Sequence, residues 1–537
     1  MTPCILLVHV PGLPMLPQSL LPNAYLAALA GALTQSKQEV RILDFGTLQT
    51  LQYLAERTEA SPSASDCLPF LKARHQRQQD ASLERQVRLL SGHACDQIVG
   101  NAPSIAALYA GDGGDLYMAR KLAIRLRRVM PALRLVLVGP YAATYGNLIL
   151  EKLSEFDAVC VTDPVSALLA CTRDDIRHLS TPLPHGLLVR GQDSAAVADP
   201  AIFQHDPLTL PEYEASVYPA MDQGKFRFFT VEHIRGTGWG AAEHVRHART
   251  VAREVQHLEK ACSARVFHFE GENTPPEQVR MLTRELLASE PIYYSRSGHL
   301  GHYDIAVLDA LVSSGCQAVG FELHTGSQRL LEEFYHAPFG VSKAEELLGR
   351  AQTHDLYTVT RLTFPCPRED YHTQAETLRI LQRCRPQAAP MDIPILTPDS
   401  PWLERAAEFG FSAPHASYAT AVTGAKAESA AEASRTVGYR MPGLREREAL
   451  RLKSQLETGI SELGISTTGC ERFGCIARMA GYAGLEAAYF DAFAHALSAL
   501  QIDTISGLMA TFNTSAAVAS NTVAFRPLVS TRAAVGN

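Results

Sequence analysis

Short apolar runs alternate with amphipathic helical stretches over the first 171 residues. An unbroken apolar run of about four to eight residues suits a strand that is covered on both faces. The runs that predict such strands are 4–10, 39–44, 104–109, 133–138 and 157–161. Helical stretches such as 23–33 and 118–129 lie between them. This alternation predicts a doubly wound parallel sheet, on which ligands bind at the carboxyl ends of the strands.

A second series of strands and helices follows a less regular segment. Residues 172–222 are predicted to be a linker, and residues 223–434 to form a partial (β/α)6 TIM-like barrel. The six predicted barrel strands are 226–231, 265–270, 292–295, 318–323, 357–362 and 391–396. From residue 435 the pattern is helical, which predicts a helical C-terminal region over 435–537. The expected fold class is therefore α/β: a Rossmann-like sheet domain over 1–171, then the barrel, then helices.

Composition and charge narrow the class of protein. The 537 residues are 46% apolar, which excludes a largely disordered chain. Lysine and arginine total 49 against 56 acidic residues, a balance that argues against a nucleic-acid binder. No apolar run reaches the roughly 18–20 residues of a membrane span, and no signal peptide precedes the first strand. The eleven cysteines are scattered without CxxC spacing, so we expect a reduced, cytoplasmic protein with a small-molecule partner.

Several short segments occur in a distinctive order over residues 1–410. They read PNAYLAA at 22–28, LVLVGP at 135–140, LP at 210–211, FHFEGENT at 267–274 and GFELHTGSQ at 320–328. In this order and spacing they resemble the cobalamin-binding-domain branch of the radical S-adenosylmethionine (SAM) enzymes. The resemblance implies a cobalamin-binding sheet domain followed by a SAM-binding barrel.

The loop after the first barrel strand departs from that family. There the family carries three cysteines spaced CxxxCxxC, whose thiolates hold a four-iron cluster. In this chain the cysteine positions fall on Thr237, Ala241 and His244. One imidazole cannot replace three thiolates, so we expect no [4Fe-4S] cluster and no radical cleavage of SAM.

The resemblance also implies where cofactors would bind. Cobalamin is expected at the carboxyl edge of the first sheet, beside Tyr109, Gly111, Gly139, Pro140 and Tyr141. The chain lacks the Asp-x-His-x-x-Gly motif that gives many corrinoid domains a cobalt-binding histidine. The alternative is an empty, purely structural domain.

SAM is expected at the barrel mouth. The contacts implied there are Glu322 and His324, together with the glycine-rich loop at Arg235, Gly236, Gly238, Trp239 and Gly240. Glycine backbone N–H groups can approach an anion, and an indole can stack on a sulfonium. The alternative is a relic loop in which Trp239 fills the space that the cluster left.

Acid–base chemistry is predicted at one strand end of the barrel. His268 and Glu270 are two residues apart, so they share one face of a strand, and Glu272 follows in the next turn. Barrel sites form at the carboxyl ends of strands, which makes these three residues the candidate catalytic groups. Cys470 and Cys475 are too few for a zinc site, and we expect them at a helix start.

Together these features predict a cluster-less enzyme of specialised, natural-product metabolism. It would use cobalamin, SAM or both in polar chemistry, most simply methyl transfer, or in a cyclisation or elimination driven by the sulfonium leaving group. One alternative is a non-catalytic partner or ligand-sensing subunit that keeps the fold. Another is a barrel that has recruited a single metal ion through its histidines and glutamates.

Overall fold

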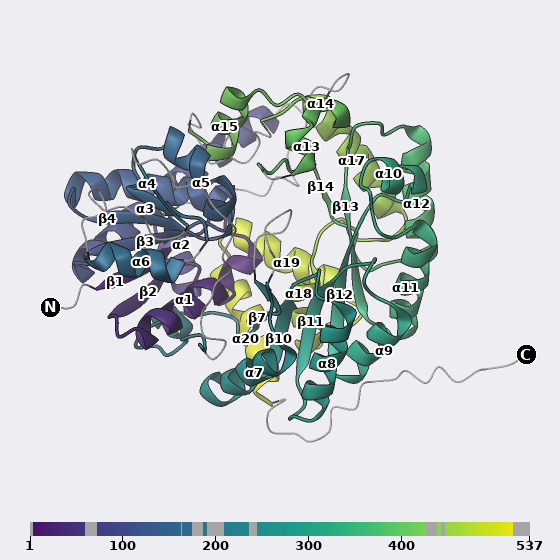
Figure 1. Ribbon diagram of the computed structural model, residues 1–537, viewed down its shortest axis with the longest axis horizontal. Helices are drawn as coiled ribbons and strands as arrows, with labels where there is room; N and C mark the ends of the chain where they lie inside the picture. Colours follow the sequence, from purple (N-terminus) through teal and green to yellow (C-terminus); the bar gives the residue numbers. More distant parts are fainter. Residues whose placement is uncertain are drawn as a thin grey trace, which may run out of the picture.

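The computed structural model describes residues 4–58, 72–162, 164–173, 186–190, 209–235, 244–398, 400–425, 438–441 and 446–518. Two six-stranded sheets, each covered by helices, lie beside one another, and C-terminal helices lie between them (Figure 1). No helix in these ranges is both long and apolar enough to cross a bilayer.

The first sheet has the strand order β2-β1-β3-β4-β5-β6. Its strands are β1 (Ile5–His9), β2 (Val40–Asp44), β3 (Ile105–Tyr109), β4 (Arg134–Val138), β5 (Ala158–Cys160) and β6 (Leu187–Val189). The first five are parallel, as the apolar runs predicted, and β6 pairs antiparallel with β5. The segment expected to be only a linker therefore supplies an edge strand.

Helices accompany the strands of the first sheet. They are α1 (Ala24–Gln35), α2 (Leu48–Ala55), α3 (Lys72–Asn101), α4 (Gly113–Val129), α5 (Pro140–Lys152) and α6 (Pro164–Arg173). Helix α4 begins earlier than the sequence pattern indicated, because the Asp112 side chain caps it by accepting from the Asp115 backbone N–H at 2.9 Å. This capped turn lies directly after β3, at the carboxyl edge of the sheet.

The second sheet has the order β14-β13-β12-β11-β10-β7, and its neighbouring strands are parallel. Its strands are β7 (Phe229–Glu232), β10 (Val266–Glu270), β11 (Tyr293–Gly298), β12 (Cys316–His324), β13 (Tyr357–Thr363) and β14 (Met391–Asp392). The helices between them are α7 (Ala248–Cys262), α8 (Pro276–Leu287), α9 (Ile305–Ser313), α10 (Gln328–Glu333), α11 (Val341–Thr353) and α12 (Tyr371–Cys384). All six predicted barrel strands are confirmed, with bounds moved by a few residues.

Side chains alternate between the two faces of this sheet. Phe267 and Phe269 pack in the same core as residues of α7, on the outer face. Val266 points to the opposite face from Phe267 and Phe269. It belongs to the core that contains Cys475 and Ile476 of α18 (Glu471–Met479). Since alternate residues of a strand face opposite ways, His268 and Glu270 face the barrel interior with Val266.

Helix α18 packs against the inner face of β11, β12 and β13. It passes closest at Gly474, where a Cβ would lie 2.0 Å from the Tyr357 ring. Cys470 is its N-cap residue and Cys475 is buried within it, as the sequence predicted. The C-terminal region thus fills the inside of the partial barrel.

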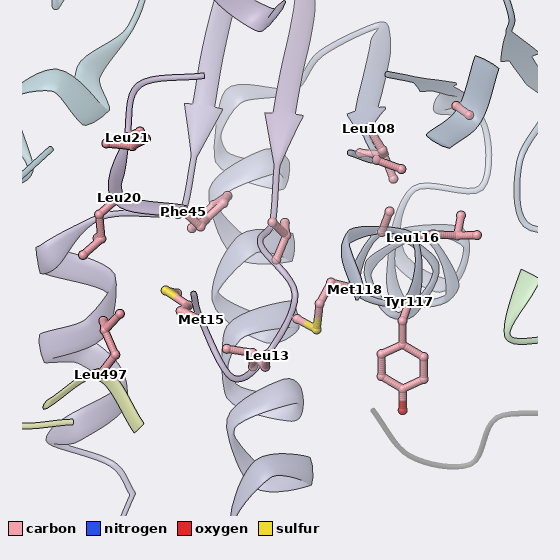
Figure 2. Close-up of a cluster of buried hydrophobic side chains, with 14 of the residues drawn as sticks. Leu13, Met15, Leu20, Leu21, Phe45, Leu108, Leu116, Tyr117, Met118 and Leu497 are labelled. Atoms are coloured by element: carbon pink, nitrogen blue, oxygen red, sulfur yellow. The ribbon is translucent and has the colours of Figure 1, made fainter. Parts of the chain in front are cut away.

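The remaining helices follow the second sheet, and some of them contact the first sheet unit. They are α13 (Pro401–Glu404), α14 (Ala406–Phe409), α15 (His415–Thr423), α17 (Glu446–Glu462), α19 (Glu486–Ser498) and α20 (Ile502–Val518). Helix α15 contacts α4 and α5, whereas α20 contacts α2. Leu497 of α19 lies in one core with Met15 and Leu20 of the first domain (Figure 2).

Candidate functional site

A buried network of charges lies where β1 and β2 end. His9 Nδ1 lies 2.9 Å from Asp44 Oδ1, and His9 Nε2 lies 3.7 Å from Asp115 Oδ1. Burial acts to lower the pKa of His9, but the two carboxylates raise it to about 9. The imidazole is therefore protonated at neutral pH, and both of its nitrogens face carboxylates.

A segment leading into the barrel completes this network. Lys225 Nζ lies 2.6 Å from Asp44 Oδ2, and the Tyr218 hydroxyl donates to the same oxygen at 2.5 Å. Burial raises the pKa of Asp44, but Lys225 and His9 outweigh it and hold that pKa well below its ordinary value. This network was not predicted from the sequence. The only local signal was that the second predicted strand ends in an acid.

Tyr109 is the last residue of β3, and its side chain lies against the glycine turns at Gly111 and Gly139. A Cβ on Gly111 would lie 2.8 Å from the Tyr109 hydroxyl. Gly139 has φ +112°, and a Cβ there would lie 2.5 Å from the Ala110 carbonyl oxygen. These glycines were predicted to admit a cofactor. Their immediate role is to make room for the chain itself, since only glycine tolerates this conformation and approach.

The next two predicted cofactor residues belong to α5. Pro140 is the exposed first residue of the helix. The Tyr141 hydroxyl donates to the Val422 carbonyl at 2.6 Å, which ties α5 to α15. The Tyr141 hydroxyl therefore contributes to the contact between the two domains.

His268 lies inside the barrel and is fully buried. Its Nδ1 lies 2.9 Å from Ser295 Oγ, and its Nε2 has no hydrogen-bond partner. Burial and the nearby arginines, Arg472 first, hold the pKa of His268 well below its ordinary value. His268 is therefore neutral and buried here, and its predicted role as a general acid or base stays a prediction.

Glu270 is the most accessible of the three predicted catalytic groups. Its side chain is 50% exposed, and its Oε1 accepts from Arg472 at 3.0 Å. The following turn is fixed by the buried Arg296, which donates to the Gly271 carbonyl at 3.3 Å. Glu272 lies in this turn; burial raises the pKa of Tyr303, and the charge of Glu272 adds a smaller effect in the same direction. Strand alternation places both His268 and Glu270 at the barrel interior, where His268 is fully buried and Glu270 is half exposed.

Three residues that sequence reasoning missed share the barrel interior with Glu270. Glu471 of α18 pairs with Arg361 of β13 and accepts from the Ser297 hydroxyl at 2.9 Å. A Cβ on Gly320 would lie 2.6 Å from Glu471 Oε2, so the glycine makes room for this carboxylate. Burial acts to raise the pKa of Glu471, but the neighbouring guanidiniums bring it to about 2.

Glu322 and His324 end β12, as predicted for the SAM contacts. His324 Nε2 lies 3.8 Å from Glu322 Oε2, and its Nδ1 lies 3.1 Å from Thr363 Oγ1. The His324 ring stacks on Tyr335 with centroids 4.6 Å apart. Burial lowers the pKa of His324, so this histidine is neutral at pH 7. The cation that Glu322 acts on is Arg361 of β13, whose pKa it raises after Glu471.

The carboxyl edges of the two sheets face one another. Burial raises the pKa of Tyr109, and four carboxylates raise it further: Asp115, Glu270, Asp112 and Glu232. Glu232 and Glu270 end β7 and β10 of the barrel, whereas Asp112 and Asp115 lie at the start of α4. The edge predicted for cobalamin and the strand ends predicted for catalysis therefore lie close enough together for charges of both to act on Tyr109.

The glycine-rich loop is described only at its two ends. β8 (Ile234–Arg235) pairs antiparallel with β9 (His244–Val245), so a hairpin begins and closes there. Gly236, Thr237, Gly238, Trp239, Gly240 and Ala241 lie outside the described residues. Their predicted contacts with SAM stay predictions.

The described residues contain no group of three or more His, Cys, Asp or Glu side chains placed to hold a metal ion. The alternative of a recruited metal site gains no support from them.

Solved structures share this fold. TsrM from Kitasatospora setae, a radical SAM methyltransferase with cobalamin and a [4Fe-4S] cluster bound, has a TM-score of 0.59 at 14% identity, over 96% of this chain and 100% of its own. The same enzyme with tryptophan substrate and a SAM analogue has a TM-score of 0.58, over 86% of this chain and 89% of its own. The cobalamin-dependent SAM radical enzyme OxsB with aqua-cobalamin has a TM-score of 0.52 at 12% identity, over 76% of this chain and 56% of its own. No protein-family model and no curated protein matches the chain.

Proposed function

We propose that this chain is a cobalamin- and SAM-binding methyltransferase that works without an iron–sulfur cluster. The fold is that of cobalamin-dependent radical SAM methyltransferases. The observation that carries the proposal is the meeting of the two carboxyl edges at Tyr109 and Glu270, where both a sheet-bound and a barrel-bound cofactor would lie.

The residues at the first edge fit a corrinoid that takes no nitrogen ligand from the protein. His9 ends β1 at this edge, and both of its nitrogens face carboxylates. Tyr25 and Tyr109 add partly exposed rings, 5.5 Å apart, on which a flat macrocycle can lie. When bound, cobalamin supplies a cobalt centre that can carry a methyl group.

The donor set at the loop does not fit a [4Fe-4S] cluster. Thr237, Ala241 and His244 stand where the related enzymes have three cysteines, and a four-iron cluster needs thiolates. We therefore derive no radical step. In polar transfer, the methyl group passes from the sulfonium to a nucleophile, and the thioether leaves with the bonding electron pair.

Glu270 is the residue suited to take the proton that the nucleophile loses. Its carboxylate is half exposed at the end of β10 and is oriented by Arg472. General-base assistance of this kind contributes about 10²–10⁴-fold to a rate. Glu322 faces the same interior and can hold the ammonium group of SAM or of the acceptor.

Two titrations of the purified full-length protein test the proposal. Hydroxocobalamin should bind with one site per chain and shift the visible spectrum of the corrinoid. Anaerobic incubation with iron and sulfide should leave no stoichiometric cluster. About four irons per chain with cysteine-type charge-transfer absorption would refute the cluster-less proposal. Absence of corrinoid binding would instead favour the non-catalytic subunit.

A further inference from the structure

Two arginines meet inside the barrel, one from a strand and one from the C-terminal helix α18. Arg361 lies on the inner face of β13, and Arg472 lies in the first turn of α18. The two lie close together, because Arg361 pairs with Glu471, the residue next to Arg472 in the chain, and its charge acts on Arg472. Two adjacent positive charges repel, so such an arrangement requires negative partners.

Each arginine has one acidic partner in the described chain. Arg361 pairs with the buried Glu471, and Arg472 pairs with the half-exposed Glu270. A guanidinium carries five N–H donors, and each of these arginines donates a single hydrogen bond among the described residues. Most of their donors are therefore available to another acceptor.

Solvent reaches both guanidinium side chains. Arg361 is 25% exposed and Arg472 is 28% exposed, although both face the interior of the barrel. The start of α18 adds to the positive potential here, because the backbone N–H groups of a first helical turn are unpaired and Cys470 provides no side-chain cap.

From this geometry we infer that Arg361 and Arg472 form a carboxylate-binding site at the floor of the barrel mouth. This inference rests on the proposed function and deepens it, because the ligand would be a carboxylic acid that is either the methyl acceptor or SAM itself. Arg472 donates to Glu270 through Nη2 only, so it can hold a ligand carboxylate and orient Glu270 together. Helix α18 is then part of the active site.

Matched pairs of small acids and their primary amides test this site. Hippuric acid and hippuramide, phenylacetic acid and phenylacetamide, and indole-3-acetic acid and its amide are each added to the full-length protein, and binding is followed by ligand-observed NMR. The acids should bind and the amides should not. Equal signals from acid and amide, or no signal from any acid, would overturn the inference.

Variants then locate the site. Arg472→Gln should weaken acid binding at least about tenfold, the scale of a lost charge-assisted hydrogen bond. Glu270→Gln should strengthen it, because it frees Arg472 and removes a competing charge. The double variant R361Q/E471Q removes both members of the buried ion pair, so neither charge is left in the interior without its partner. Unchanged affinity in R472Q and in R361Q/E471Q would refute the site. Arg405→Gln, at an exposed arginine near α14, is the control and should bind like wild type.

The source of the carboxylate is decided with SAM and its decarboxylated analogue. If the SAM carboxylate lies on the arginines, R472Q weakens SAM binding and leaves the analogue unaffected. If the acceptor lies there, R472Q weakens the small acids alone and SAM does not displace them. Corrinoid titration of the wild-type protein separates this inference from the proposed function: if no corrinoid binds, the cofactor proposal is refuted and the acid-binding results still stand.

Discussion

His9 shows how one buried side chain can make the stability of a domain depend on pH. It is 7% exposed and lies between Asp44 and Asp115. Its pKa rises from 6.5 to about 9 on folding. A raised pKa means that the folded state binds the proton more tightly than the unfolded chain, so the stabilisation is full below about pH 6.5 and disappears as the pH passes about 9.

We predict that His9→Gln removes this pH dependence. The shift corresponds to about 3 kcal/mol of unfolding free energy. The difference in stability between wild type and H9Q should therefore shrink by about that amount between roughly pH 6 and pH 10, measured by urea unfolding of the two proteins in parallel. His495→Gln, at an exposed histidine, should follow wild type throughout. An H9Q curve parallel to wild type would contradict the assignment.

At the scale of elements, local patterns predicted most of the architecture. Apolar runs located five strands of the first sheet and all six of the second, because a covered strand must be apolar over its length. The short strand β6 was not predicted, because an apolar run of only three residues is too short to indicate a strand. The position of α18 could not be read locally, since Glu471 and Arg361 are separated by 110 residues.

The same distinction explains the outcome at the candidate site. Alternation along β10 correctly gave His268 and Glu270 a shared face, but it could not show which of them solvent reaches. That depends on Ser295 and on Arg472, which arrive from other elements.

We predict that the fit of α18 against the barrel depends on Gly474. A Cβ at this position would lie 2.0 Å from the Tyr357 ring, so Gly474→Ala must displace the helix or the ring. Overpacking of this kind costs about 1–3 kcal/mol of unfolding free energy. Gly507→Ala in α20 is the matched control, because nothing lies within 4 Å of its Cβ, and the change should be neutral or stabilising by up to about 1 kcal/mol. Chemical denaturation compares the two; a G474A protein as stable as G507A would show that the helix is loosely packed.

At the scale of the whole molecule, the C-terminal helices and the connecting segment hold the sheets together. Phe226, from the segment that leads into β7, packs against Phe473, Phe493 and Phe512 of α18, α19 and α20. On the other side, Arg120 of α4 donates to the carbonyl oxygens of Gly424 and Ala425 beyond α15. The meeting of the two carboxyl edges is therefore fixed by contacts on both sides of it.

Lys225 is the most buried charge in this connection. Its ammonium group contacts Asp44 and donates to the carbonyl oxygens of Ser19 and Leu21, at 3.0 Å each. Burial lowers the pKa of Lys225 and Asp44 opposes this effect. Such a pair contributes little net stability compared with an apolar pair of the same shape, but breaking it leaves a charge without its partner in the interior.

We predict that Lys225→Met destabilises the protein by about 3–5 kcal/mol, and that the double variant K225M/D44N recovers part of this loss. The recovery is expected because the second change removes the stranded carboxylate, which would keep its contacts with His9, Tyr218 and the Gly46 backbone N–H but would have lost its ammonium partner. Lys453→Met is the control, since the ion pair of Lys453 with Glu457 lies on the surface of α17, where such pairs contribute at most about 1 kcal/mol. Urea unfolding of wild type, K225M, D44N and K225M/D44N gives the coupling free energy of the buried pair, and K453M is measured beside them. If K225M loses no more stability than K453M, the buried pair does not couple the first sheet to the barrel, and the packing of Phe226 against the C-terminal helices must do so instead.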